Sequence, residues 1–169
     1  VNEIASKKIQ TLIDDLIETM RYANGAGLAA TQIGELFRIC VVEVNKNIRY
    51  PYKPNIPLTV LINPVITCLS EDNLKLYEGC LSVPNLRGEI ERCAKIRVQF
   101  LDRHGNKMDI ISQGITAGTF QHEVDHLDGI LFVDKVKNTH TLTTINEFSK
   151  FYEKHFIEIV KDTVSKYGG

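Results

Sequence analysis

The segment from Gln121 to Gly129 (QHEVDHLDG) contains two histidines four residues apart, with a glutamate directly after the first. On a helix, at about 100° per residue, His122 and His126 project from the same side one turn apart, so both imidazoles can reach one metal ion. Glu123 is adjacent to a ligand and is placed to accept a proton from an attacking water. The alternative for so short a pattern is a surface helix with two solvated histidines, so the flanking residues must decide.

A catalytic centre of this kind takes three protein ligands and leaves one position open, so a third ligand is required. One class of metalloproteases uses a further histidine just downstream, but the residue at that position here is Phe132. Glu147 and Glu153 lie beyond it and suit an exposed helix face. Upstream, Cys80 offers a thiolate, and the glycine before it permits tight backbone beside an ion. Spacing alone does not separate a ligand from a buried structural cysteine.

Length and composition predict one ordinary globular domain over residues 1–169. The chain is 43% hydrophobic and 24% charged, and a domain of this size buries enough surface to need no disulfides. The formal net charge of −1, with acidic and basic residues interspersed, predicts no direct binding to nucleic acid or to an anionic membrane. No apolar run approaches the roughly 20 residues that span a bilayer. Since the N-terminus also lacks a signal-peptide pattern, we expect a cytoplasmic protein.

The four cysteines show no C-x-x-C pair or other close spacing. Because the core needs no cross-link, we expect all of them to be free. Cys40, Cys68 and Cys93 are expected to be small buried hydrophobic residues. Cys80 alone is a candidate for chemistry.

Apolar periodicity predicts helices at both ends of the chain and in the histidine segment, with strands between them. The last helix opens with a capping-box pattern. The expected helices are 4–23, 115–127 and 141–167, and the expected strands are 38–44, 60–66 and a hairpin over about 96–110. This arrangement predicts an α+β fold, with small mixed or antiparallel sheets around a central metal-binding helix and with N-terminal and C-terminal helices.

Three segments together resemble the signature motifs of the peptide deformylase family. They are 25–32 (GAGLAATQ), 78–82 (EGCLS) and 121–126 (QHEVDH), in the family's order and approximate spacing. The resemblance extends over roughly residues 9–136. One such motif is weak on its own, whereas the three together are highly specific.

The resemblance implies a hydrolase that removes the formyl group from the N-terminal formyl-methionine of nascent polypeptides and releases formate. Glu123 would act as general base and acid, and the Gln32 amide and the Leu81 backbone N–H would form the oxyanion hole. The ligands implied for one divalent metal ion are Cys80, His122 and His126.

Further family positions concern the substrate. The resemblance implies that Gly27 pairs with the peptide backbone. It implies an apolar methionine pocket that involves Leu76, Gly118 and Thr119. Because related proteins often have a bulkier apolar residue in place of Gly118, we expect a broader side-chain preference. Two basic residues also match family positions near the site, where solvated surface arginines are an equal alternative: Arg87 and Arg92.

Metal identity and partners leave alternatives open. Ligand chemistry alone favours zinc, whereas the resemblance implies physiological Fe(II), with zinc, nickel or cobalt in purified protein. The rival enzyme is a zinc metallopeptidase that cleaves internal amide bonds. A ribosome-binding module is a third hypothesis, weakened by the acidic residues among its lysines. Those lysines are Lys150, Lys154, Lys161 and Lys166. A bacterial cytoplasm is the expected location, with an organelle as the alternative.

Overall fold

The structure, a computed structural model, describes residues 3–46 and 53–168. Its helices, strands and helical turns are α1 (Lys7–Tyr22), β1 (Gly27–Ala29), η1 (Ala30–Ile33), β2 (Ile39–Val44), β3 (Ile56–Cys68), β4 (Asn73–Cys80), β5 (Val83–Cys93), β6 (Lys95–Leu101), β7 (Lys107–Gln113), α2 (Gly114–Leu127), η2 (Phe132–Lys135), η3 (Thr139–Thr141), β8 (Thr143–Thr144), α3 (Ile145–Phe151) and α4 (Glu153–Tyr167). Antiparallel strands form one sheet in the order β1-β2-β3-β6-β7 and another in the order β4-β5-β8. The predicted α+β class is confirmed.

Helix α1 forms as its apolar spacing predicts. The Ser6 hydroxyl accepts a hydrogen bond from the Ile9 N–H and caps the first turn. The six apolar residues of the predicted stripe are all buried against β1 and β2, and each such burial stabilises the fold by roughly 1.5–3 kcal/mol. Beyond the helix, Asn24 has a φ of 52°, a left-handed conformation that ends it.

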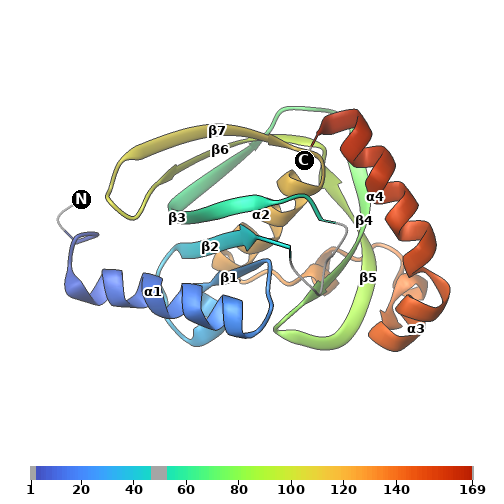
Figure 1. The fold of residues 1–169 in the computed structure, drawn as a ribbon, viewed down its shortest axis with the longest axis horizontal. Coiled ribbons are helices and arrows are strands. Elements are labelled where there is room, and N and C mark those ends of the chain that lie inside the picture. The colour runs from blue at the N-terminus through green and yellow to red at the C-terminus, as the bar shows by residue number, and fades with distance from the viewer. Residues whose placement is uncertain (1–2, 47–52, 169) are drawn as a thin grey trace.

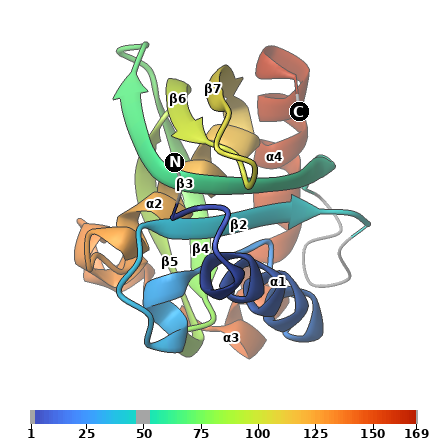
Figure 2. The same cartoon turned by 90° about the vertical axis from the view of Figure 1, so that its left-hand side faces the viewer.

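The five-stranded sheet is more extensive than the sequence predicts. Strand β1 lies in a stretch for which no strand was predicted, and β3 is 13 residues long rather than the predicted seven. Figure 2 shows β3 bending sharply along its length. At Asn63 the φ is 50°, and the register with β6 shifts between Ile62 and Val65. This bulge lets the first half of β3 pair with β2 and the second half with β6.

The two hairpins differ in how well local pattern reveals them. The pair β6 and β7 falls within the predicted hairpin and is confirmed. The pair β4 and β5 is missed, because Gly79, Pro84 and Gly88 interrupt its alternation. Those strands form the second sheet, which carries Cys80.

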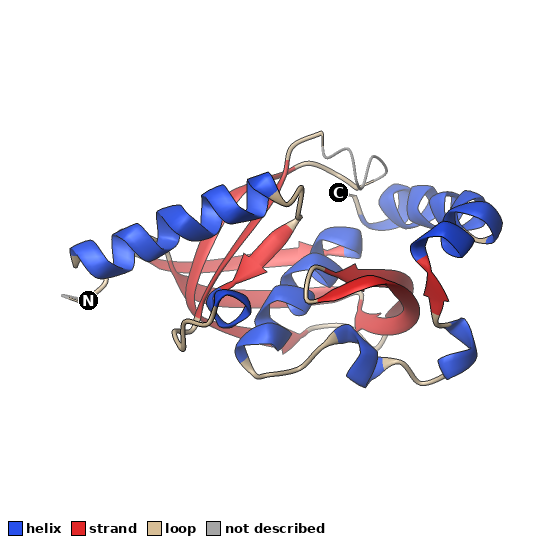
Figure 3. Ribbon diagram, turned by 90° about the horizontal axis from the view of Figure 1, so that it is seen from below, coloured by secondary structure: helices blue, strands red, loops and turns tan. Residues whose placement is uncertain are grey.

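Helix α2 lies at the centre of the molecule, with strands around it and α1 and α4 on either side (Figure 3). It forms where the sequence predicts a helix. Its apolar residues Phe120, Val124 and Leu127 pack into the core beneath the five-stranded sheet. The opposite side faces the second sheet, where His126 contacts Cys80 and His122 contacts Glu78, both on β4.

The C-terminal region differs from the single helix expected over 141–167. A short strand, β8, is followed by α3 and α4, and the helix breaks at Tyr152, where φ is −119° (Figure 1). The Thr144 hydroxyl caps α3 as predicted, accepting from an N–H in its first turn. The break brings Phe148 and Phe156 against the same ring, that of Tyr77 on β4. Aromatic packing on the second sheet therefore overrides a continuous helix.

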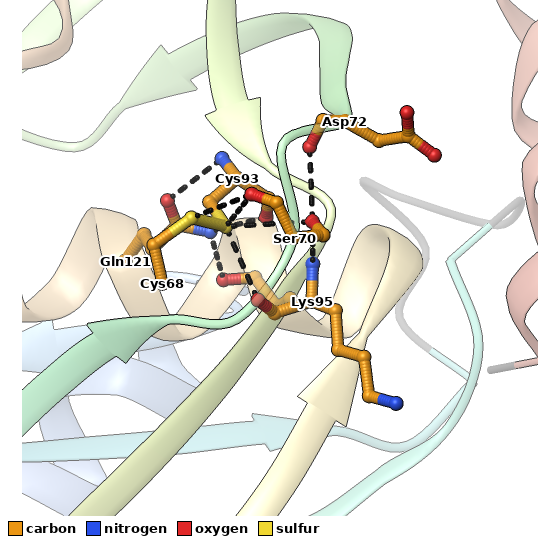
Figure 4. The surroundings of a disulfide bond; sticks show 7 residues. Cys68, Ser70, Asp72, Cys93, Lys95 and Gln121 are labelled. Atoms are coloured by element: carbon orange, nitrogen blue, oxygen red, sulfur yellow. Dashed lines mark hydrogen bonds between the residues drawn. A yellow bond between two sulfur atoms is a disulfide. The ribbon is translucent and has the colours of Figure 1, made fainter.

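The cysteine prediction is wrong for two residues. Cys68 and Cys93 form a disulfide (Figure 4), with their Cα atoms 6.0 Å apart, and Cys68 is exposed rather than buried. Cys40 and Cys80 are free and buried. The sequence separation of 25 residues gives no sign of the pairing, because the bend of β3 and the missed β4–β5 hairpin bring the two residues together. Among the described residues, no helix has the length and apolar character needed to cross a membrane.

Candidate functional site

The end of β4 and one side of α2 bring a thiol and two imidazoles together. Cys80 Sγ lies 3.2 Å from His126 Nε2, and His126 Nε2 lies 3.2 Å from His122 Nε2. All three donor atoms lie within 4.8 Å of one another. The two histidines meet because they are one helical turn apart, whereas Cys80 reaches them only through the packing of the second sheet on α2. The donor set fits a divalent metal ion that prefers sulfur and nitrogen ligands.

The charges of this cluster also suit a metal. Burial alone raises the pKa of Cys80, but hydrogen bonds with His122 and His126 lower it to about 5. Burial alone lowers the pKa of His122, but the neighbouring Glu78 carboxylate raises it to about 10. Without a metal, the site therefore holds a thiolate beside an imidazolium at neutral pH. A divalent cation would take the place of the imidazolium proton as the partner of the thiolate.

A buried ion-pair network holds His122 in position. Glu78 Oε2 lies 2.7 Å from His122 Nδ1, which leaves Nε2 facing Cys80 and His126. The Arg92 guanidinium donates to Glu78 at 3.0 and 2.9 Å and also to Asp125. Only 2% of Arg92 is exposed, so the alternative of a solvated arginine is wrong. Such outer contacts fix the tautomer and orientation of a metal-binding histidine.

The sequence shows Glu78 within the motif 78–82 but not its contact with His122. Its position two residues before Cys80 does not predict a hydrogen bond to Nδ1 of a histidine 44 residues away. Arg87, the other family arginine, is also buried, with its guanidinium 5.0 Å from the centre of the Phe148 ring. Neither arginine is a surface residue.

Glu123 is buried beside Cys80 and His122, and the three residues line one cleft. Its Oε2 atom has no hydrogen-bond partner among the described residues. Burial raises its pKa, although the positive charge of His122 opposes this effect. The side chain lies against Gly27, where even a methyl group would be 2.5 Å from Oε1. Glu123 is thus confined near Cys80 and the two histidines, and one of its carboxylate oxygens makes no hydrogen bond to a described residue.

The two expected oxyanion donors border the cleft. Gln32 Oε1 accepts from the Ala29 N–H at 2.8 Å, which fixes the amide so that its NH₂ group faces the site. That NH₂ group donates to Ser82 Oγ at 2.9 Å and lies 3.7 Å from Cys80 Sγ. Leu81 follows Cys80 in the turn between β4 and β5 and lines the cleft. Both residues therefore border the cleft beside Cys80.

The cleft has an empty volume of about 680 Å³ and combines polar and apolar walls. Leu76 and Gly118 form part of the apolar wall, and a methyl group on Gly118 would lie 2.7 Å from Leu76 Cδ1. Leu76 therefore fills the space left by the missing side chain. Thr119 is buried and accepts a hydrogen bond from Lys53 Nζ at 3.1 Å.

The sequence gives no sign of two further cleft residues. Lys53 comes from the connection between β2 and β3, and Phe156 comes from α4. No motif contains either residue, and both arrive through tertiary packing. All the predicted site residues except the deeply buried His126 line this one cleft.

Comparisons with known proteins agree on one family. The family model described as polypeptide deformylase matches residues 1–141. The chain is 41% identical to peptide deformylase 2 of Nostoc sp. over 92% of this chain and 87% of that protein. It is 47% identical to the peptide deformylase of Leptospira biflexa over 82% of this chain and 78% of that protein.

Solved structures give the same result. A Met-Ala-Ser bound crystal structure of a class I type b peptide deformylase from Acinetobacter baumannii matches with a TM-score of 0.77 and 40% identity, covering 80% of this chain and 86% of that chain. A peptide deformylase from Synechococcus elongatus in complex with actinonin matches with a TM-score of 0.72 and 30% identity, covering 99% of this chain and 76% of that chain. These matches do not support the alternative of a zinc peptidase that cleaves internal amide bonds. The chain belongs to the polypeptide deformylase family, whose members are metal-dependent hydrolases that remove N-formyl groups.

Proposed function

We propose that this chain removes the formyl group from the N-terminal formyl-methionine of nascent polypeptides, using one divalent metal ion held by Cys80, His122 and His126. The observation that carries the proposal is the meeting of one thiol and two imidazoles beside Glu123, a buried carboxylate with one oxygen that has no partner in the described part of the chain. Three protein ligands leave a position open for chemistry, as catalytic sites of this type require.

Each remaining group has one task in hydrolysis. When bound, the metal would supply a Lewis acid that favours attack of water on the formyl carbon. Glu123 would accept a proton from that water and return it to the departing amine, and the raised pKa that burial gives it supports both steps. The NH₂ group of Gln32 and the backbone N–H of Leu81 would donate to the oxygen that gains negative charge.

The substrate is proposed to lie along β1 and to place its first side chain in the cleft. Strand β1 is at the edge of the five-stranded sheet, so an extended peptide can add beside Gly27. The methionine side chain would enter the apolar part of the cleft near Leu76, Gly118 and Thr119. The related Acinetobacter baumannii protein, whose structure has Met-Ala-Ser bound, supports a peptide of this kind.

We propose Fe(II) as the physiological metal, with zinc, nickel or cobalt as replacements in purified protein. The mixed sulfur and nitrogen donor set accepts all of these ions, so the ligands alone do not select one. Protein purified without oxygen should be loaded separately with Fe(II) and Zn(II), and formate release should be compared at equal metal content. Equal rates for the two forms would contradict the iron assignment.

The test of the reaction is formate release from formyl-Met-Ala-Ser. The wild type should release formate, whereas Glu123→Gln should keep its metal and lose most of the activity, because the amide cannot accept a proton. Acetyl-Met-Ala-Ser and a peptide offering only internal amide bonds serve as control substrates. Cleavage of those controls at rates similar to the formyl peptide would contradict the proposed reaction.

Ribosome association and a bacterial cytoplasmic location remain predictions. The four lysines proposed for ribosome contact are exposed on α3 and α4, but Lys166 already pairs with Asp72. Salt-dependent pelleting with ribosomes, lost when residues 141–169 are deleted, would support that contact.

A further inference from the structure

The C-terminal helix α4 contributes one residue, Phe156, to the wall of the cleft. Only 4% of Phe156 is exposed, yet it lines the same cleft as Cys80 and Leu76. Helix α4 turns one face toward the core, with Phe156, Val160 and Thr163 buried four and three residues apart. Figure 1 shows α4 alongside β4, the strand that ends at Cys80. A helix that carries none of the three motifs therefore takes part in forming the cleft.

Two aromatic neighbours fix the orientation of the Phe156 ring. Its centre lies 5.8 Å from that of Tyr77, with the ring planes at 75°, and 5.8 Å from that of Phe148, with the planes at 70°. Edge-to-face contacts at this separation are favourable and specific in geometry. Phe148 is just as deeply buried, at 1% exposed, but it is not among the residues that line the cleft. Of the two phenylalanines in this aromatic cluster, Phe156 is therefore the one that a substrate can touch.

Phe156 also belongs to the apolar cluster that supports Leu76. Leu76, Ile115 and Phe156 are buried together in that cluster, and all three line the cleft. Leu76 fills the space beside Gly118, since a methyl group on this glycine would lie 2.7 Å from Leu76 Cδ1. Phe156 therefore limits the apolar part of the cleft in two ways. Its ring forms part of the wall, and its cluster keeps Leu76 over the glycine.

We propose that Phe156 is a specificity-determining residue, which limits the size of the first substrate side chain and favours the flexible thioether of methionine over an aromatic side chain. This inference rests on the reaction and the side-chain pocket assigned under the proposed function. A thioether sulfur gains from contact with an aromatic ring. An apolar pocket also discriminates between substrates by the groups that it has room to hold. The preference for the first residue is therefore set partly by α4.

The test compares kcat/KM of the metal-loaded wild type and of Phe156→Leu on three formyl peptides. In formyl-Met-Ala-Ser, formyl-Phe-Ala-Ser and formyl-Ala-Ala-Ser, only the first side chain differs. In Phe156→Leu, the preference for the methionine over the phenylalanine peptide should fall by about tenfold or more, since one methylene group in an apolar pocket changes discrimination by about 10- to 200-fold. The rate on the alanine peptide should stay within about twofold of the wild type, because a single methyl group does not fill the pocket.

The matched control is Phe148→Leu, the same change in the same aromatic cluster but outside the cleft. Both variants lose core packing, so both should have a lower unfolding temperature, whereas Phe148→Leu should keep the substrate preference of the wild type. An unchanged preference in Phe156→Leu, or an equal change in the two variants, would overturn the inference.

Failure of the proposed function gives a different result. In that case, the wild type would release no formate from any of the three peptides. If Phe156→Leu does not fold, Phe156→Met takes its place, because a flexible apolar side chain fills irregular gaps in a core. Its preference for the methionine over the phenylalanine peptide should also fall, and an unchanged preference would again overturn the inference.

Discussion

Gly27 lies where the chain has no room for a larger residue beside the proposed general base. A methyl group at this position would lie 2.5 Å from Glu123 Oε1, against about 3.4 Å or more for an ordinary contact. The backbone of Gly27 is in β1 and does not have a positive φ, so alanine can adopt it without strain. The substitution Gly27→Ala should therefore fold normally and push the Glu123 carboxylate away by about 1 Å.

The size of the effect follows from that displacement. A catalytic group misplaced by about 1 Å can lower the rate by about 100-fold, which corresponds to roughly 2.7 kcal/mol in the activation barrier. We expect Gly27→Ala to lower kcat for formyl-Met-Ala-Ser by this factor. The metal content should stay at the wild-type level, because the three atoms nearest the added methyl group all belong to Glu123 and none to a proposed ligand. If Gly27 acted only by pairing with the substrate backbone, KM would rise and kcat would be kept.

The matched control is Gly34→Ala. Gly34 has a φ of 85°, and nothing would contact its added methyl group within 4 Å. Alanine there is strained by roughly 1–2 kcal/mol, so the unfolding temperature should fall while kcat is unchanged. Suppose that the Gly27→Ala enzyme has full metal content and a kcat within twofold of the wild type. The reasoning that kcat depends on the position of the Glu123 carboxylate would then be refuted.

Three further outcomes test the surroundings of the site. Arg92→Met should reduce the free energy of unfolding, measured with urea, by about 3–5 kcal/mol, because it removes the buried cation that Glu78 and Asp125 share and leaves them only His122 and Lys135; a loss below 1 kcal/mol would contradict the network. Gln32→Ala should lower kcat by about 10²–10³ with metal still bound, and metal analysis beside the rate measurement checks this. In metal-free protein, the folded pKa of Cys80 is lowered to about 5, so the thiolate contributes stability that is present above the ordinary thiol value and lost as pH falls through about 5. Iodoacetamide labelling of Cys80 should accordingly have its midpoint near pH 5, and a midpoint near 8.5, the ordinary thiol value, would show that the imidazoles do not stabilise the thiolate.

The spacing of residues within one segment predicts the parts of the fold that form within that segment. The apolar stripes of α1 and α2 follow helical spacing, and packing on the sheets selects the same faces that the pattern indicates. The pairing of His122 and His126 is likewise a property of one helical turn. The ligand role of Cys80, in contrast, came from family resemblance, because spacing left it undecided.

Contacts between segments far apart in the sequence could not be predicted from the pattern of either segment alone. The contact of Glu78 with His122 spans 44 residues, and the disulfide spans 25. Both depend on the β4–β5 hairpin, whose glycines and proline hide the alternation of its strands. The break at Tyr152 is a similar case, since the sequence continues a helical pattern and only the aromatic packing against β4 ends it.

If the substrate pairs with β1 as proposed, the shortness of this strand limits how many residues of a polypeptide can form backbone hydrogen bonds with it. At about 3.3 Å per residue, its three residues span roughly 10 Å of sheet edge. A bound chain can thus form regular backbone hydrogen bonds over only its first few residues, and those bonds do not depend on side-chain identity. Under this binding mode, residues farther along the substrate form no backbone pairs with β1, which is the tolerance required of a catalyst whose substrates share one modified end and little else.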